Sequence, residues 1–274
     1  MKTIHIISET LPEGWEKSVV ETWEKGSSFK TEYDKPGDPE SKDVALMLHV
    51  KHPFAEPRIH RGFPGGLDDL EVYRNEVVLG CHDHWINPQE GKWSYTYSQR
   101  MFNYNGIDQI ADVIDKLKKT PYSRRAQAII WQPEIDMKNN HCPCLQRIWF
   151  RIEDNKLHMN THMRSQDAYK AAFMNFFAWT ELQKWVAEKI GVETGEFIHM
   201  VDSYHIYGSY FSEFEGFLKM VANRLFEGEG GRTFTTKFAL PMFVDGCDRI
   251  LRESDIPGDK KILVEKRKSY LETL

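Results

Sequence analysis

A cysteine before an apolar run is the first residue of this sequence whose type suggests chemistry. Cys144 ends the segment His141-Cys142-Pro143-Cys144 and directly precedes a strand-like stretch, Leu145 to Ile152. A thiol becomes a nucleophile when nearby positive charge lowers its pKa and favours the thiolate. Cys-x-Cys spacing also occurs in metal sites, but no second cysteine pair lies nearby in the sequence, so we expect no metal. Taken by itself, Cys144 is more simply interpreted as an inert core residue.

Two arginine-containing segments are candidates for binding an anion. Ser123-Arg124-Arg125 lies between a predicted helix and a buried strand, and Arg164-Ser165-Gln166-Asp167 lies where we expect a strand to end and a helix to begin. Guanidinium groups bind phosphate through paired donors, and a helix N-terminus adds its own N–H groups. Alternatively, the first segment is a solvated turn, and Ser165 or Asp167 caps the helix.

Three further polar residues could contact a small ligand. Asn175 lies within the apolar segment Phe173 to Trp179, where an amide without hydrogen bonds would cost about 1 to 3 kcal/mol. Its donor and acceptor suit the edge of a pyrimidine base. His205 and Tyr207 are two residues apart in a predicted strand and therefore share a face, where they could bind sugar hydroxyls. A purely structural role is the alternative for each.

The elements that must position these residues are of mixed type. Helical spacing of apolar residues predicts helices, and alternating or continuous apolar runs predict strands. Lys30 to Asp43 is polar, holds two prolines, and predicts an exposed loop, whereas Asp154-Asn155-Lys156 predicts a hairpin turn. We expect helices at 11–26, 67–79, 107–118, 168–189 and 211–226, and strands at 2–7, 44–50, 126–131, 145–152, 157–163 and 197–207. We therefore predict one α+β domain over residues 1–274.

Composition excludes several classes of function. The chain has 274 residues, with 36 Lys and Arg against 41 Asp and Glu and a formal net charge of -5, so a broad basic face for DNA is not expected. The most apolar segments are far shorter than the roughly 20 residues of a membrane helix, so we expect no membrane association. The N-terminal segment lacks the apolar core of a signal peptide. Four cysteines are too few for a disulfide framework, and a cytoplasmic location follows as the expectation.

The order and spacing of the candidate residues resemble the thymidylate synthase superfamily, which includes the pyrimidine nucleotide hydroxymethylases. Arg125 precedes Cys144 by 19 positions, Cys144 precedes Arg164 by 20, and Arg164 precedes His205 by 41. These intervals are similar to those of the family. The resemblance covers about residues 95–207, and the segment at 95–104 is more similar to compact archaeal-type or phage-type members.

The resemblance implies a fold and an assembly. It implies a large mixed β-sheet flanked by helices and a homodimer formed sheet to sheet. The chain before residue 95 matches only loosely, and the chain after Gly208 hardly at all. We therefore expect residues 209–274 to be a divergent C-terminal region of the single domain.

The resemblance also implies a role for each candidate residue. Cys144 would add to C6 of a pyrimidine nucleoside monophosphate and so activate C5 toward a one-carbon unit from 5,10-methylenetetrahydrofolate. Tyr97 would take part in removing the proton from C5. Arg164 and Ser165 would bind the phosphate, and Arg124 and Arg125 would bind the phosphate of the other subunit across the dimer interface. Asn175 would bind the base, and His205 and Tyr207 would bind the sugar. Asp167 would order folate and water, and Glu71 would carry acid-base chemistry, with Glu76 on the same predicted helix as the alternative.

Departures from the family pattern bear on the reaction product. If Trp85 matches the second tryptophan of the family's W-x-x-W segment, His82 replaces the first, and a histidine there could position water. The flexible end that closes the family's site is not visible at residues 268–274, and Leu145 replaces the histidine that commonly follows the nucleophile. We therefore expect water to capture the exocyclic methylene, which gives a 5-hydroxymethyl product.

Alternatives remain open at this point. Reductive methylation of dUMP to dTMP is the main one, followed by a nucleotide-binding regulatory protein without catalysis, and by a cysteine hydrolase. Asn175 suits uracil but does not exclude cytosine, so deoxycytidylate, cytidylate and deoxyuridylate all remain candidate substrates. The identity of the sugar depends on one hydroxyl that the sequence does not address.

Overall fold

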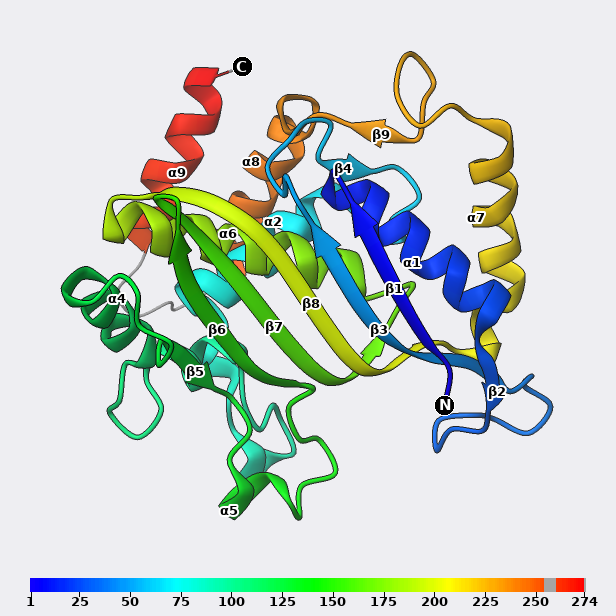
Figure 1. The fold of residues 1–274 in the computed structure, drawn as a ribbon, viewed down its shortest axis with the longest axis horizontal. Helices are drawn as coiled ribbons and strands as arrows, with labels where there is room; N and C mark the ends of the chain where they lie inside the picture. The colour runs from blue at the N-terminus through cyan, green and yellow to red at the C-terminus, as the bar shows by residue number, and fades with distance from the viewer. Residues whose placement is uncertain (254–259, 274) are drawn as a thin grey trace. The chain divides into compact units, whose positions relative to one another are not determined.

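The computed structural model describes residues 1–253 and 260–273 and contains a mixed β-sheet (Figure 1). The strand order is β1-β3-β8-β7-β6-β5, with β2 also paired to β3. β1 runs parallel to β3, whereas β2 and β8 run antiparallel to β3, and β5 runs antiparallel to β6. The strands are β1 Thr3–Ser8, β2 Ser27–Phe29, β3 Ser41–Val50, β5 Gln127–Ile129, β6 Leu145–Glu153, β7 Lys156–Asp167 and β8 Glu193–Ile206, and a separate pair joins β4 Ile59–His60 to β9 Thr233–Phe234.

Two of the helices, α1 and α4, follow residues whose side chains bind one of the helix's first N–H groups. Thr10 accepts a hydrogen bond from the Glu13 amide at the start of α1, and Asp108 accepts one from the Ala111 amide at the start of α4. No helix within residues 1–253 or 260–273 is long and apolar enough to cross a membrane. The helices are α1 Leu11–Lys25, α2 Leu67–Leu79, α3 Tyr97–Phe102, α4 Gln109–Lys119, α5 Pro133–Asp136, α6 Ala172–Ile190, α7 Phe211–Asn223, α8 Thr236–Glu253 and α9 Lys260–Thr273, with short 3₁₀ turns η1 Asp83–Trp85, η2 Pro88–Glu90 and η3 Gly208–Tyr210.

The chain divides into two compact units, each built from three segments. The first unit comprises Met1–Pro64, Asn160–Phe176 and Glu196–Thr236, and the second comprises Gly65–Met159, Phe177–Gly195 and Lys237–Leu274. The single domain expected from the sequence stays a prediction, as does the divergent nature of residues 209–274, of which 254–259 and 274 lie outside the described residues.

The first unit has its core between α1 and the sheet. α1 packs against β1 and β3 (Figure 1), and its Trp15 and Val19 side chains are fully buried. The Trp15 ring contacts Phe173 and Phe217, and its Nε1 donates to the Ala168 carbonyl at 2.9 Å. This indole therefore fixes the chain that follows β7.

The second unit joins helices to β5 and β6. α4 packs against β5, and α3 packs against both α2 and α4. A buried ion pair ties α3 to α5, with the Arg100 guanidinium 2.9 and 3.1 Å from the two oxygens of Asp136. The pair holds α3 in place and with it Tyr97, the first residue of that helix.

Two of the element boundaries that the structure corrects lie close to candidate site residues. The prediction of a helix from 168 is wrong because β7 continues to Asp167 and α6 begins at Ala172. The Ala168 amide donates to the His205 carbonyl at 2.8 Å, so this residue is held beside β8 rather than in a helix. The predicted loop from Lys30 to Asp43 is wrong at its end, since β3 already begins at Ser41.

Candidate active site

Cys144 lies at the start of β6 with its side chain partly exposed. β6 begins at Leu145, so Cys144 directly precedes the strand. The Gln146 side chain fixes the backbone here by donating to the carbonyls of Pro143 and Cys144, each at 3.2 Å. The thiol is close enough to Tyr73 and Tyr97 for its charge to act on both hydroxyls. The structure therefore places Cys144 close to Tyr97, and the catalytic roles expected of the two residues stay predictions.

The tyrosines beside the thiol are held as neutral phenols. Desolvation, together with neighbouring groups that include Cys144, raises the pKa of Tyr73 and that of Tyr97 well above the usual value. Tyr97 also accepts a hydrogen bond from the Leu145 amide, and its ring lies 5.7 Å from that of Tyr95, centroid to centroid. Because desolvation keeps the phenol neutral, the Tyr97 hydroxyl retains its own proton for a ligand or a water.

Hydrogen bonds of Thr96 and Asp83 fix the start of α3, the helix that carries Tyr97. Thr96 accepts a hydrogen bond from the Gln99 amide at 2.9 Å and donates to the Asp83 carboxylate. Desolvation raises the pKa of Asp83. With the Arg100–Asp136 pair one turn further on, both ends of α3 are fixed.

His82 is oriented by a carboxylate and an aromatic ring. Its Nδ1 lies 2.8 Å from Glu76, and its ring stacks on Trp85 at 3.8 Å between centroids with an interplanar angle of 9°. Trp93 packs edge-on against both rings and is 41% exposed. Since a carboxylate only accepts, Nδ1 carries the proton in the neutral imidazole, and Nε2 is then the acceptor. Within the described residues Nε2 has no hydrogen-bond partner, and the nearest carboxylate, that of Glu253, is 3.9 Å away.

Glu71 lies in a different, fully buried cluster. Its carboxylate is paired with Arg74 and lies 3.2 Å from Lys266, 2.9 Å from the Asn75 amide and 3.3 Å from the Tyr270 hydroxyl. Desolvation raises the pKa of Glu71 to about 7, against the opposing charge of Lys266.

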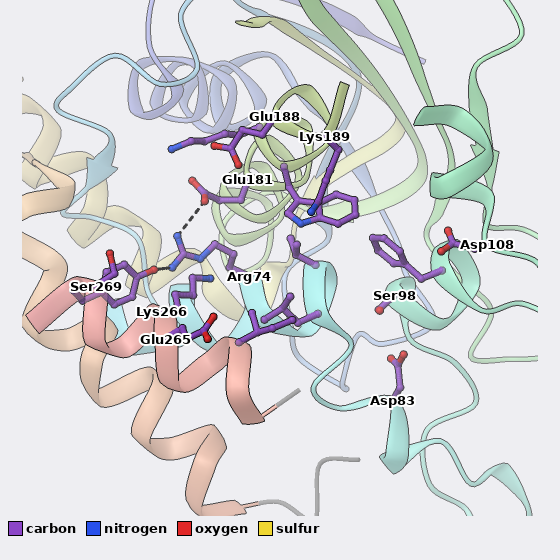
Figure 2. Close-up of a pocket in the computed structure, with 17 residues that line it drawn as sticks. Arg74, Asp83, Ser98, Asp108, Glu181, Glu188, Lys189, Glu265, Lys266 and Ser269 are labelled. Carbon is purple, nitrogen blue, oxygen red and sulfur yellow. Dashed lines mark hydrogen bonds and ion pairs between the residues drawn. The ribbon is translucent and has the colours of Figure 1, made fainter. Parts of the chain in front are cut away.

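A cavity of about 920 Å³ lies next to this cluster. Figure 2 shows Arg74 of α2 between Glu181 of α6, at 3.1 Å, and the residues Lys266 and Ser269 of α9. Its lining combines acidic and basic groups with apolar side chains of α2 and α6. Arg74, Lys266, Glu71 and Glu181 compensate one another's charge, so the cluster itself carries no excess of either sign.

Arg124 and Arg125 lie in an exposed turn before β5, as expected. Their backbone is fixed, because the Arg125 amide donates to Ser123 Oγ at 3.2 Å and the Trp149 indole donates to the Arg124 carbonyl at 3.0 Å. Both side chains are exposed. A turn with a fixed backbone and two solvent-facing guanidinium groups is suited to contact a phosphate or a partner molecule.

In the first unit, one of the predicted phosphate-binding residues, Ser165, lines a cavity together with the two predicted sugar-binding residues. This cavity has a volume of about 840 Å³, and its lining includes Ser165, His205 and Tyr207. The His205 and Tyr207 rings lie 4.5 Å apart, centroid to centroid, so the structure brings together the two residues predicted to bind sugar. Asp43 of β3 also lines this cavity.

Asp167 stabilises the segment between β7 and α6 and acts on His205. Its Oδ1 accepts hydrogen bonds from the Tyr169 and Lys170 amides at 3.0 and 2.9 Å. Desolvation raises the pKa of Asp167 and lowers that of His205, while each charge opposes the shift of the other. Arg164 is half-buried in β7, and Asn175 is 6% exposed in the first turn of α6.

The expected capping role of this segment is wrong. Ser165 and Asp167 lie within β7, and α6 begins five residues after Asp167, so neither caps that helix and Arg164 does not lie at its N-terminus. Sequence reasoning also missed Tyr73 and Asp43. Tyr73 could have been found from its spacing of three residues from Glu76 on one helix face, whereas no local signal marks Asp43.

Comparison with known proteins found a matching family model and named relatives. Residues 69–225 match the family model described as thymidylate synthase. A protein named "Putative thymidylate synthase" from Methanosarcina mazei is 34% identical over 203 residues, covering 74% of this chain and 88% of that protein. One of the same name from Methanosarcina barkeri is 32% identical over 211 residues, covering 75% and 94%.

A solved structure has the same fold. The thermostable thymidylate synthase A from Bacillus subtilis matches with a TM-score of 0.60 at 20% identity, covering 75% of this chain and 83% of that one. This likeness confirms the predicted fold class, a mixed sheet flanked by helices.

Proposed function

Because this chain belongs to the thymidylate synthase family, we propose that it transfers a one-carbon unit to C5 of a pyrimidine nucleoside monophosphate and releases a 5-hydroxymethyl nucleotide. Members of this family are one-carbon transferases that use 5,10-methylenetetrahydrofolate as donor, and this chain is one of them. The proposal specific to this chain is that the product carries a 5-hydroxymethyl group. The observation that carries it is the Glu76–His82 pair.

Cys144 is the proposed nucleophile. Its sulfur adds to C6 of the pyrimidine, which makes C5 nucleophilic, and the C–S bond breaks again when product is released. Partial exposure and two phenols beside the thiol support this assignment. Tyr97, as a neutral phenol with its oxygen anchored by the Leu145 amide, orders the water through which the C5 proton leaves.

Residues of the first unit, together with an exposed turn, are proposed to bind the nucleotide. The resemblance gives the phosphate to Arg164 and Ser165, the base to Asn175, and the sugar to His205 and Tyr207. The shared cavity of Ser165, His205 and Tyr207 supports the assignments of these three residues. Arg124 and Arg125 are proposed to bind the phosphate of the other subunit in a homodimer, as their exposure allows.

The aromatic residues around η1 fit the folate cofactor. A partly exposed indole, Trp93, packs against the Trp85–His82 stack, and such a surface suits a flat pterin and its aminobenzoyl group. Trp85 and Trp93 would hold the cofactor and Asp167 would orient it. When bound, methylenetetrahydrofolate supplies a methylene group at the oxidation level of formaldehyde.

His82 is proposed to direct water to the new exocyclic methylene. Glu76 holds the Nδ1 proton, so Nε2 can accept a proton from water as the water oxygen bonds to the methylene carbon. The electron pair then passes through C5 and C6 and expels the Cys144 sulfur. We propose Glu76, rather than Glu71, as the acid-base glutamate of the site because of this contact.

Thymidylate synthesis is the second candidate. Relatives in Methanosarcina carry the name "Putative thymidylate synthase", which favours reductive methylation of dUMP. The two reactions differ in electron balance, because methylation oxidises the tetrahydrofolate to dihydrofolate and hydroxymethylation does not.

One experiment separates the candidates. The enzyme is incubated with methylenetetrahydrofolate and dUMP, UMP, dCMP or CMP, while absorbance reports dihydrofolate and mass spectrometry reports the product. We expect a hydroxymethyl nucleotide without dihydrofolate, and we expect His82→Trp to lower its yield by about 10²-fold or more, the factor that one general base contributes. Stoichiometric dihydrofolate and dTMP would instead establish thymidylate synthesis.

A further inference from the structure

Three polar side chains of β3 and β8 lie together in the cavity of the first unit. His205 and Asp43 are directly paired across β3 and β8, so their side chains share one face of the sheet. Ser203 lies two residues before His205 and shares that face as well. All three residues line the cavity.

The tautomer of His205 follows from its neighbours. Nδ1 lies 3.2 Å from the Ser203 carbonyl oxygen and 3.4 Å from its hydroxyl. The carbonyl only accepts, so Nδ1 carries the proton and Nε2 presents a lone pair. His205 is 5% exposed, and within the described part of the chain Nε2 has no hydrogen-bond partner. A buried acceptor without a donor is costly unless a ligand or water supplies the donor.

Asp43 adds a second acceptor beside the first. The Ser203 hydroxyl donates to one carboxylate oxygen of Asp43, and this bond fixes the carboxylate against the strand. Burial raises the pKa of Asp43, while Ser203 and the His205 charge oppose the shift. An ionised carboxylate has no proton to donate, so its second oxygen accepts only.

From these observations we infer that the nucleotide is a ribonucleoside monophosphate, and that Asp43 selects it. The inference rests on the proposed function. A ribose offers two adjacent hydroxyl donors, which match the His205 Nε2 and Asp43 acceptors, whereas a 2′-deoxyribose offers one. With a deoxynucleotide, one of the two acceptors, buried His205 or half-buried Asp43, lacks its partner. The residues matched by the family model begin at 69, so Asp43 lies outside that match.

The test compares kcat/KM for CMP with dCMP and for UMP with dUMP, using C5 tritium release as readout. We expect wild type to prefer the ribonucleotide by tenfold or more, the factor of one hydrogen bond to a charged group. Asp43→Ala and Asp43→Asn are expected to remove most of this ratio by lowering ribonucleotide turnover, with deoxynucleotide turnover little changed. Asp202→Asn is the matched control, because Asp202 lines the same cavity but its side chain is 62% exposed and pairs with His162; its ratio stays that of wild type.

The outcomes separate this inference from the proposed function. Deoxynucleotide preference in wild type, or equal losses on both sugars in the Asp43 variants, overturns the role of Asp43 while one-carbon transfer stands. Absence of tritium release from all four nucleotides overturns the proposed function. In that case calorimetry compares the binding of CMP with that of dCMP. Tighter binding of CMP that is lost in Asp43→Ala supports the inference, and equal affinity of the wild type for the two nucleotides refutes it.

Discussion

Replacement of Arg100 by methionine tests how the helix that carries Tyr97 is held. Arg100 is 2% exposed, and its guanidinium contacts both oxygens of Asp136, at 2.9 and 3.1 Å, and the Ile130 carbonyl at 3.3 Å. Asp136 is 1% exposed, and the only other hydrogen bond that its carboxylate makes within the described residues is with the Gln132 amide at 2.7 Å. Methionine preserves the length of the side chain but leaves the Asp136 charge without a counterion.

The expected loss follows from that geometry. Removing one partner of a buried ion pair costs about 3 to 5 kcal/mol, because the remaining charge stays desolvated. This is a large share of the roughly 5 to 15 kcal/mol by which folded proteins are stable. In Arg100→Met/Asp136→Leu no buried charge remains, and the main cost is the Gln132 amide that loses its acceptor, about 1 to 3 kcal/mol. The double variant should therefore be more stable than Arg100→Met.

Urea denaturation followed by circular dichroism measures both free energies. Arg151→Met is the matched control, because Arg151 is 52% exposed and its contact with Glu153 is 3.7 Å long; its effect should stay below about 1 kcal/mol. A loss below about 1 kcal/mol in Arg100→Met would refute the reasoning, as would a double variant less stable than the single one.

Three further predictions concern the thiol, the phenol and the buried glutamate. Cys144→Ala should reduce C5 tritium release more than 10³-fold, since no covalent adduct can form, while calorimetry still detects nucleotide binding; normal turnover would disprove the mechanism. Tyr97→Phe should lower kcat by about 10² to 10⁴ with a smaller change in KM, because the ring packing is kept and only the hydroxyl is lost; an unchanged kcat would remove Tyr97 from the proton path. Burial raises the pKa of Glu71 to about 7 from its usual 4.5, so the folded state binds the proton more tightly than the unfolded state does. The free energy of unfolding should therefore fall by on the order of 3 kcal/mol as pH rises from 4.5 to 7. Urea titrations between pH 5 and 8 should show this slope flattened in Glu71→Gln, and an equal slope in both proteins would contradict it.

Sequence patterns correctly predict the helices and turns that are determined by residues close together in the sequence. The helix expected at 67–79 is α2 itself, and it ends at Gly80, whose φ of 64° is the left-handed conformation that glycine adopts without strain. The hairpin between β6 and β7 turns at Asp154 and Asn155, which have φ of 48° and 59°. These two residue types tolerate the left-handed region better than most, so the turn could be read directly.

Elements set by distant partners could not be read in this way. The apolar pattern after Asp167 favours a helix, but the Ala168 carbonyl is taken by the Trp15 indole and its amide by the His205 carbonyl. Those partners lie 153 and 37 positions away in the sequence, so the delayed start of α6 has no local signal. The same holds for Asp43, which reaches the sugar-binding end only because β3 pairs with β8.

The two glutamates of α2 show the same limit within a single helix. Glu71 and Glu76 are five residues apart, which places them about 140° apart around the helix axis, so one face of α2 cannot present both. Their surroundings differ because of other segments: Lys266 and Tyr270 of α9 approach Glu71, whereas His82 approaches Glu76. A proton on Glu71 is therefore shared within a cluster that balances its own charge. A proton near Glu76 can pass through the His82 imidazole, whose Nε2 accepts none of the described hydrogen bonds. This difference between the surroundings of Glu71 and Glu76 is the physical reason for placing acid-base chemistry at Glu76.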